Sequence, residues 1–147
     1  MTTTDVVRTQ RDVLLAIRSG ALPPPPAGAF LGLRIEEVEP GAAVFGWTPQ
    51  QQHLNATGTV NGGLLATLAD FALCCAVNDV PADAPVVTQN LTMNYLRPIT
   101  LETGPLHARA RVLHQGRRSA TTEASIVDDG GRLHVHATAT VALAGRG

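Results

Sequence analysis

The chain of 147 residues contains no lysine, only two cysteines, and few aromatic residues, which make up 3% of it. All eleven basic residues are arginine, and twelve acidic residues bring the formal net charge to −1. This balance gives no electrostatic basis for general binding to nucleic acid or to an anionic membrane surface. Arginine suits phosphates and carboxylates, so a few local anion sites stay open as an interpretation.

Disulfides and membrane-spanning helices are not expected either. Cys74 and Cys75 are adjacent, and neighbours on a helix point in different directions, so we interpret both as core packing residues. No apolar run approaches the ~20 residues that a membrane-spanning helix needs. The N-terminal residues lack a basic start followed by an apolar core, so no signal peptide is expected and a cytoplasmic protein is predicted.

The N-terminal region predicts one short amphipathic helix over residues 4–18, capped by Thr4 or Asp5. Ser19-Gly20 should end this helix. Its apolar face is expected to contain Val6, Val13, Leu14 and Ile17.

A run of four prolines, Pro23 to Pro26, follows this helix. Proline fits neither a helix interior nor a central strand, so the run is interpreted as a linker. We therefore divide the chain into an N-terminal helix with a proline-rich linker, residues 1–29, and a main domain, residues 30–147.

The main domain predicts six strands and one long helix. The helix should run from Gly62 to about Val80. The strands are expected at residues 33–39, 42–48, 86–96, 106–112, 120–126 and 133–141. Alternation places His107, Arg109 and Arg111 outside, and an inner face on the last strand made of Leu133, Val135, Ala137, Ala139 and Val141.

The predicted helix is apolar nearly all round, and such a helix must be covered on most sides. A single antiparallel sheet curved around it would provide that cover. The fold class predicted from this layout is α+β, with a curved sheet wrapped around one central helix and an N-terminal helical arm.

The start of the central helix could bind an oxyanion. Asn61 is a suitable N-cap, and Gly62 and Gly63 allow another group to approach the free N–H groups of the first turn. The positive end of the helix dipole lies at the same place. An ordinary glycine-rich loop leading into a helix explains the same residues.

Asp70 lies in the middle of this apolar helix, and a buried carboxylate is costly unless it is paired. Three interpretations are open: a catalytic carboxylate, a structural ion pair with an arginine from a strand, or an aspartate at an interface. Gly62 and Asp70 are about two helical turns apart, or ~12 Å. If both act on one substrate, they should come from different subunits, which predicts an obligate dimer.

Taken together, Asn55, Asn61-Gly62-Gly63 and the Leu68-Ala69-Asp70 segment resemble the hotdog-fold acyl-CoA thioesterases of the PaaI-like (phenylacetate-pathway) group. Tyr95-Leu96-Arg97-Pro98 and His114-Gln115-Gly116-Arg117-Arg118 are also similar to that group. The resemblance covers roughly residues 31–143. It implies a hotdog fold, a homodimer that pairs into a homotetramer, and active sites at the dimer interface.

The resemblance also implies roles for individual residues. Gly62 would polarise the thioester carbonyl through its N–H, and Asp70 of the partner subunit would act as nucleophile or as base for water. Asn55 would position the water or the carboxylate, and Thr88 would offer a hydroxyl to that carboxylate. Gly63 would lie beside the bound substrate, and the CoA phosphates would contact Arg97, Arg117 and Arg118. Asn61 stands where the group usually has histidine; it can still cap and hydrogen-bond but carries no charge.

The sequence therefore predicts an acyl-CoA thioesterase that needs no metal or redox cofactor, CoA being part of the substrate. A non-catalytic hotdog protein that binds acyl-CoA is the alternative, supported by Asn61. A hotdog hydratase would need a histidine–acid pair, and the helix has no histidine. His134 and His136 share a strand face but lack a third ligand, so a solvated strand is favoured over a metal site.

Overall fold

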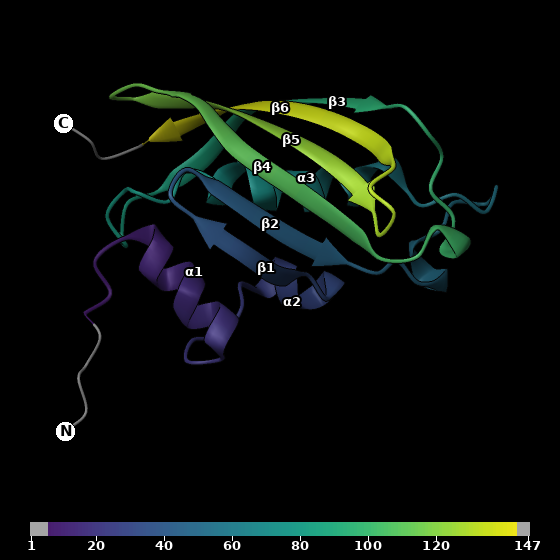
Figure 1. Cartoon of the computed structure of the whole chain (residues 1–147), viewed down its shortest axis with the longest axis horizontal. Coiled ribbons are helices and arrows are strands. Elements are labelled where there is room, and N and C mark those ends of the chain that lie inside the picture. Colours follow the sequence, from purple (N-terminus) through teal and green to yellow (C-terminus); the bar gives the residue numbers. More distant parts are fainter. Residues whose placement is uncertain (1–5, 144–147) are drawn as a thin grey trace.

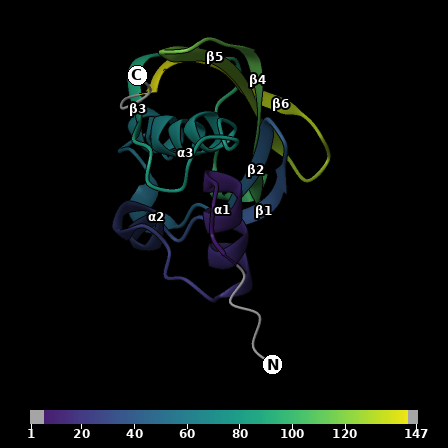
Figure 2. The same ribbon diagram turned by 90° about the vertical axis from the view of Figure 1, so that its left-hand side faces the viewer.

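A six-stranded antiparallel sheet wraps around one central helix, α3, in the computed structural model, which describes residues 6–143. Figure 2 shows the sheet curving over α3, with α1 and α2 on the opposite, open side. The strand order is β1-β2-β4-β5-β6-β3, and this confirms the predicted α+β layout (Figure 1). The elements are α1 (Gln10–Ser19), α2 (Pro26–Leu31), β1 (Arg34–Glu39), β2 (Ala42–Trp47), α3 (Gly62–Cys75), β3 (Val86–Tyr95), β4 (Leu106–Gln115), β5 (Ser119–Asp128) and β6 (Leu133–Leu143), with short 3-10 turns at Gln51–His53 and Leu101–Thr103.

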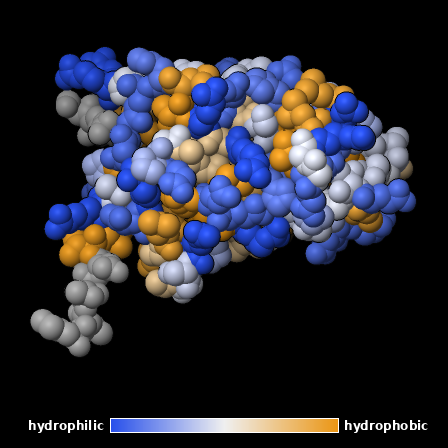
Figure 3. All heavy atoms as spheres, viewed as in Figure 1, coloured by the Kyte–Doolittle hydropathy of each residue, from blue (hydrophilic) through white to orange (hydrophobic). Residues whose placement is uncertain are grey.

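Small side chains line the contact between the sheet and α3. Ala69 and Ala72 of α3 are fully buried against alanines on the inner faces of β4, β5 and β6. Small residues on both surfaces let the helix lie close to the sheet. The outer face of the sheet is polar, as the alternation predicts, with apolar groups in small separate patches (Figure 3). Leu133 is the exception to the predicted inner face, because it is exposed at the start of β6.

The central helix is shorter than predicted, ending at Cys75 rather than near Val80. Asn78 explains the difference. Its fully buried side-chain amide donates to the Cys75 carbonyl, a group left free by the last helical turn, and to the Glu39 carbonyl at the end of β1. The side chain thus satisfies the helix end and links it to the sheet.

Helix α1 starts at Gln10, later than predicted. Thr9 and Asp12 form a reciprocal capping box, and residues 6–8 are not helical. Thr4 and Asp5, the predicted caps, lie outside the described residues, and Val6 is exposed rather than part of a buried face. The end at Ser19 with Gly20 in a left-handed conformation is confirmed.

The proline run does not act only as a linker, because Pro26 is the first residue of α2, a helix that was not predicted. The first helical position accepts proline because its N–H would have no helical partner. The buried Trp47 indole donates to the Leu31 carbonyl at 2.9 Å, which holds the end of α2 against β2. Within residues 6–143, no helix combines the length and apolar character needed to span a membrane.

Candidate active site

The start of α3 carries a network of amide groups. The Asn61 side-chain oxygen accepts from the N–H groups of Gly63 at 2.8 Å and Leu64 at 3.3 Å, which confirms it as the N-cap. Its side-chain nitrogen donates to the Asn55 side-chain oxygen at 2.8 Å. Within residues 6–143 the Gly62 N–H has no hydrogen-bond partner. It is therefore a free donor at the positive end of the helix.

Tyr95, at the end of β3, covers the same helix start. Its hydroxyl donates to the Gly62 carbonyl at 2.6 Å, and partial burial raises the pKa of Tyr95, so the hydroxyl keeps its proton. A Cβ placed on Gly62 would lie 3.2 Å from the tyrosine ring. Gly62 thus allows the ring to approach closely, while Arg97 lines the hollow beside them.

Asp70 lies two turns further along α3 and is half-buried. Its Oδ1 accepts a short 2.6 Å hydrogen bond from the Thr88 hydroxyl of β3. Within the described residues, no arginine or histidine lies at ion-pair distance from Asp70. The interpretation of Asp70 as a structural ion pair is therefore wrong for this protomer.

A bulge in β3 aims Thr88 at Asp70. The pairing of β3 with β6 shifts by one residue between Thr88 and Asn90. Without that shift, Thr88 and Leu91 would face opposite sides of the sheet, because side chains alternate along a strand. With it, Leu91 packs against the core and Thr88 also points inward.

Cys74 joins this cluster from one turn along α3. Its sulfur lies 3.1 Å from the Thr88 hydroxyl oxygen and 3.8 Å from Asp70 Oδ1. Burial, and then the nearby Asp70 carboxylate, raises the pKa of Cys74 to about 11, although the Thr88 hydrogen bond opposes this. At neutral pH the thiol is protonated and can donate. The prediction that Cys74 only packs in the core misses this contact, which the i,i+4 spacing from Asp70 could have indicated.

One protomer thus contains two separate clusters along the central helix. Asn55, Asn61 and Gly62 lie together at its start, and Asp70 and Thr88 lie together about two turns later. The hollow beside Gly62 and the hollow beside Asp70 share no lining residue. A single copy does not bring the two clusters to one reacting atom.

The three arginines predicted to bind phosphates are exposed, and they lie near opposite ends of β6. The Arg97 N–H donates to the His134 carbonyl at the start of β6. The Arg118 carbonyl instead accepts from Leu143, at the other end of that strand, with Arg117 beside it in the β4–β5 turn. None of the three forms an ion pair within residues 6–143.

The thioesterase superfamily model matches residues 57–135, which include Gly62, Asp70 and Thr88. This chain belongs to the thioesterase superfamily. The acyl-coenzyme A thioesterase PaaI of Escherichia coli is 35% identical over 98 residues, covering 67% of this chain and 68% of that enzyme. Human acyl-coenzyme A thioesterase 13 is 32% identical over 89 residues, covering 60% of this chain and 63% of the human enzyme, less than two thirds of its length.

Solved structures of the superfamily share the fold of this thioesterase-superfamily chain. A phenylacetic acid degradation-related protein of Ralstonia eutropha aligns with a TM-score of 0.80 and 28% identity, over 88% of this chain and 98% of that one. The hotdog fold expected from the sequence motifs is confirmed, and membership in the superfamily supports thioester hydrolysis as the activity.

Of the two histidines predicted on a solvated strand face of this superfamily member, His134 departs from the prediction, whereas His136 is partly exposed. His134 is buried, and its Nε2 lies 3.0 Å from Asp128, while His136 pairs with Glu123 at 2.9 Å. These hydrogen bonds lower the pKa of both carboxyl groups. Across the described residues, no group of three or more histidine, cysteine or acidic side chains could hold a metal ion.

Proposed function

We propose that this chain hydrolyses acyl-CoA thioesters to a carboxylic acid and free CoA. One observation carries the proposal: Asp70 is a half-buried carboxylate with no ion-pair partner among the described residues, held by Thr88 beside an open hollow. A carboxylate kept there at a cost in stability is suited to chemistry rather than to packing. The acyl-CoA thioesterases among its relatives support CoA as the leaving group.

In this mechanism the Gly62 N–H binds the thioester oxygen as negative charge develops on it. Such a preorganised donor at a helix start stabilises the oxyanion in the transition state. Asp70 then acts in one of two ways. It either attacks the carbonyl carbon and expels the CoA thiolate, leaving an anhydride for water to cleave, or it takes a proton from the water that attacks.

The site is proposed to form between two copies of the chain. β3 is an edge strand, and a free edge favours pairing with another strand. Thr88 lies near the start of β3, and Tyr95, which contacts Gly62, lies at its end. Two β3 strands paired antiparallel about a twofold axis would place the Asp70 cluster of one copy opposite the Gly62 cluster of the other. The family resemblance extends this proposal to a homotetramer built from such dimers.

The remaining predicted residues have supporting roles in this proposal. The Asn55–Asn61 amide pair would orient the water or the carboxylate without carrying charge. Arg97, Arg117 and Arg118 would bind CoA phosphates, since exposed guanidinium groups are free to do so. No metal or redox cofactor enters these steps. A cytoplasmic location is proposed because Cys74 and Cys75 are free thiols.

Release of free thiol from a panel of acyl-CoAs tests the activity, with wild type compared against Asp70→Asn. Asparagine keeps an oxygen that can accept from Thr88, so the fold should survive while the carboxylate is lost. Turnover in the wild type that falls by two or more orders of magnitude in the variant supports the proposal, since a hundredfold loss of rate corresponds to ~3 kcal/mol of activation free energy. A wild type that binds acyl-CoA but hydrolyses none would favour the non-catalytic binding protein.

A further inference from the structure

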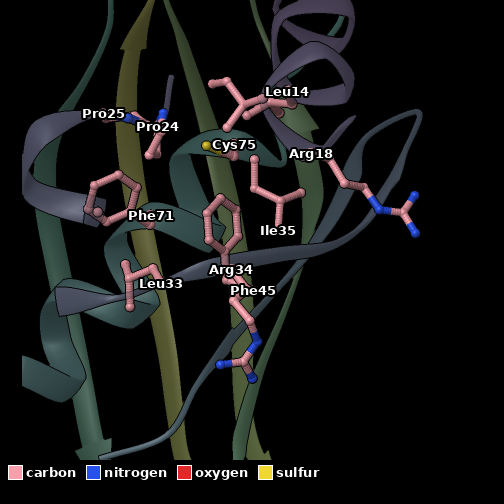
Figure 4. Close-up of a pocket in the computed structure, with 12 residues that line it drawn as sticks. Leu14, Arg18, Pro24, Pro25, Leu33, Arg34, Ile35, Phe45, Phe71 and Cys75 are labelled. Carbon is pink, nitrogen blue, oxygen red and sulfur yellow. The ribbon is translucent and has the colours of Figure 1, made fainter. Parts of the chain in front are cut away.

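An apolar cavity of about 380 Å³ lies between the helices α1, α2 and α3, the strands β1 and β2, and the proline segment, Pro23 to Pro26. Figure 4 shows side chains of Leu14, Ile35, Phe45 and Phe71 gathered around it. The two phenyl rings are 6.0 Å apart at a 40° tilt. Arg18 and Arg34 also line the cavity, but both guanidinium groups point away from these apolar groups, and that of Arg34 pairs with Glu36 at 3.6 Å. The interior of the cavity is therefore suited to an uncharged group.

This cavity adjoins the hollow that contains Asp70. That hollow, of about 620 Å³, is lined by Asp70 and Thr88, and three side chains line both spaces: Leu14, Phe71 and Cys75. Phe71, the next residue after Asp70, lies where the two spaces adjoin, because its side chain lines both of them. A substrate whose carbonyl is held at Asp70 thus has an apolar space within reach, past Phe71.

The wall formed by α1 is firmly attached to the domain. The Gln10 side chain donates to the Ala82 carbonyl at 2.7 Å, and the Arg11 side chain donates to Asn78 at 3.1 Å. Leu14 is buried between α1 and α3. These contacts indicate a preformed pocket rather than a loose arm.

We infer that this cavity binds the acyl group of the substrate, and that α1 and the proline segment select uncharged, apolar acyl groups. The inference rests on the proposed thioesterase function. The cavity volume lies within the ~300–1,000 Å³ typical of ligand pockets and is more than twice that of a ~150 Å³ apolar cavity that binds benzene. A phenyl ring or a medium alkyl chain therefore fits, whereas an acyl group ending in a carboxylate would lose its hydration without gaining a partner.

Gly28 of α2 offers a direct test, because it is buried, lines the cavity and lies next to Phe71. A Cβ added at Gly28 would lie 3.6 Å from the Phe71 ring, an ordinary contact, so a larger side chain there should fill the cavity. Ala29, exposed on the same helix, provides the matched control Ala29→Leu.

The experiment measures kcat/KM for octanoyl-CoA, phenylacetyl-CoA, succinyl-CoA and acetyl-CoA. In the wild type, octanoyl-CoA or phenylacetyl-CoA should exceed succinyl-CoA. Gly28→Leu should lower the preference for that substrate over acetyl-CoA by about tenfold or more, since such pockets discriminate by 10–200-fold per methylene. Ala29→Leu should leave it unchanged, and thermal unfolding shows whether both variants fold. An unchanged preference in folded Gly28→Leu, or a wild type that prefers succinyl-CoA, would overturn the inference.

Calorimetric binding of octanoyl-CoA and of CoA to the same proteins, each carrying Asp70→Asn so that no thioester is hydrolysed during the titration, separates this inference from the proposed function. If the wild type hydrolyses nothing, but its Asp70→Asn form binds octanoyl-CoA more tightly than CoA and loses that difference with Gly28→Leu, the pocket stands and the catalytic proposal fails. If hydrolysis occurs and the difference in affinity is the same in both proteins, the activity stands and the pocket is wrong.

Discussion

Asp70 is oriented by Thr88, and Thr88 is oriented by a bulge in β3. The sequence allowed Asp70 to be singled out, because a carboxylate among leucines and alanines needs an explanation. Its partner Thr88 came from the family resemblance rather than from the strand pattern. Strict alternation through residues 86–96 places Thr88 and Leu91 on opposite faces, and a bulge leaves no clear signal in residue types.

The hydroxyl of Thr88 is testable by a pair of substitutions. Thr88→Val keeps the shape but removes the donor, so kcat should fall by about ten- to a hundredfold, since a hydrogen bond to a charged group contributes ~1.5–3 kcal/mol. Thr88→Ser keeps the donor and should keep most of the activity. Steady-state kinetics on the best acyl-CoA makes the comparison. A folded Thr88→Val protein with wild-type kcat would show that the hydrogen bond has no catalytic role.

Both cysteines should be unreactive at neutral pH. Burial raises the pKa of Cys74 to about 11 and that of Cys75 to about 12, so the folded protein keeps both thiols protonated where an ordinary thiol begins to ionise near 9. The contribution of these protonated thiols to the free energy of unfolding is fully present below pH 9. It is lost as pH rises toward 11, where Cys74 ionises in the folded protein. Iodoacetamide labelling of the native protein should stay slow at pH 8 and quicken above pH 10, whereas rapid labelling at pH 8 without unfolding would contradict the raised pKa of both thiols.

The elements follow the sequence where local pattern and tertiary contacts agree. All six strands and the central helix form where alternation and apolar content predict them. The ends of the helices were less predictable. α3 stops early because Asn78 binds its last turn from a loop, and α2 exists because Trp47 holds it. The end of α3 and the presence of α2 both depend on contacts between residues distant in the chain, and such contacts cannot be predicted from a local sequence pattern.

The contribution of the α3 cap to stability can be measured with two substitutions at Asn61. Asn61→Ala removes the acceptor for two N–H groups and the bond to Asn55, so the free energy of unfolding should fall by about 1 kcal/mol. Asn61→Ser keeps a cap and should recover most of that loss. Urea unfolding measures both proteins. Equal stability of wild type and Asn61→Ala would mean that the cap contributes nothing to the fold.

At the scale of the whole molecule, one protomer carries two half-sites that it does not join. The Gly62 cluster and the Asp70 cluster lie about two turns apart on α3, and both contact the edge strand β3. The sequence allowed this separation to be predicted from helical rise alone. The apolar cavity beneath α1 was not predictable, because its walls come from five elements that pack together only in the folded chain.

The central claim is that Gly62 of one copy and Asp70 of another act on the same thioester. Gly62→Pro deletes the free N–H at a helix position that accepts proline, and Gly62→Ala is the control that keeps the N–H. Gly62→Pro alone and Asp70→Asn alone should each be nearly inactive. Dimers containing one copy of each, purified through two different affinity tags, retain one intact site.

Thiol release by these mixed dimers is the decisive measurement. A site shared between copies predicts about half of the wild-type activity per dimer, because one of two symmetric sites is complete. Mixed dimers as inactive as either parent would contradict the shared site, since Gly62 and Asp70 would then have to act within a single copy.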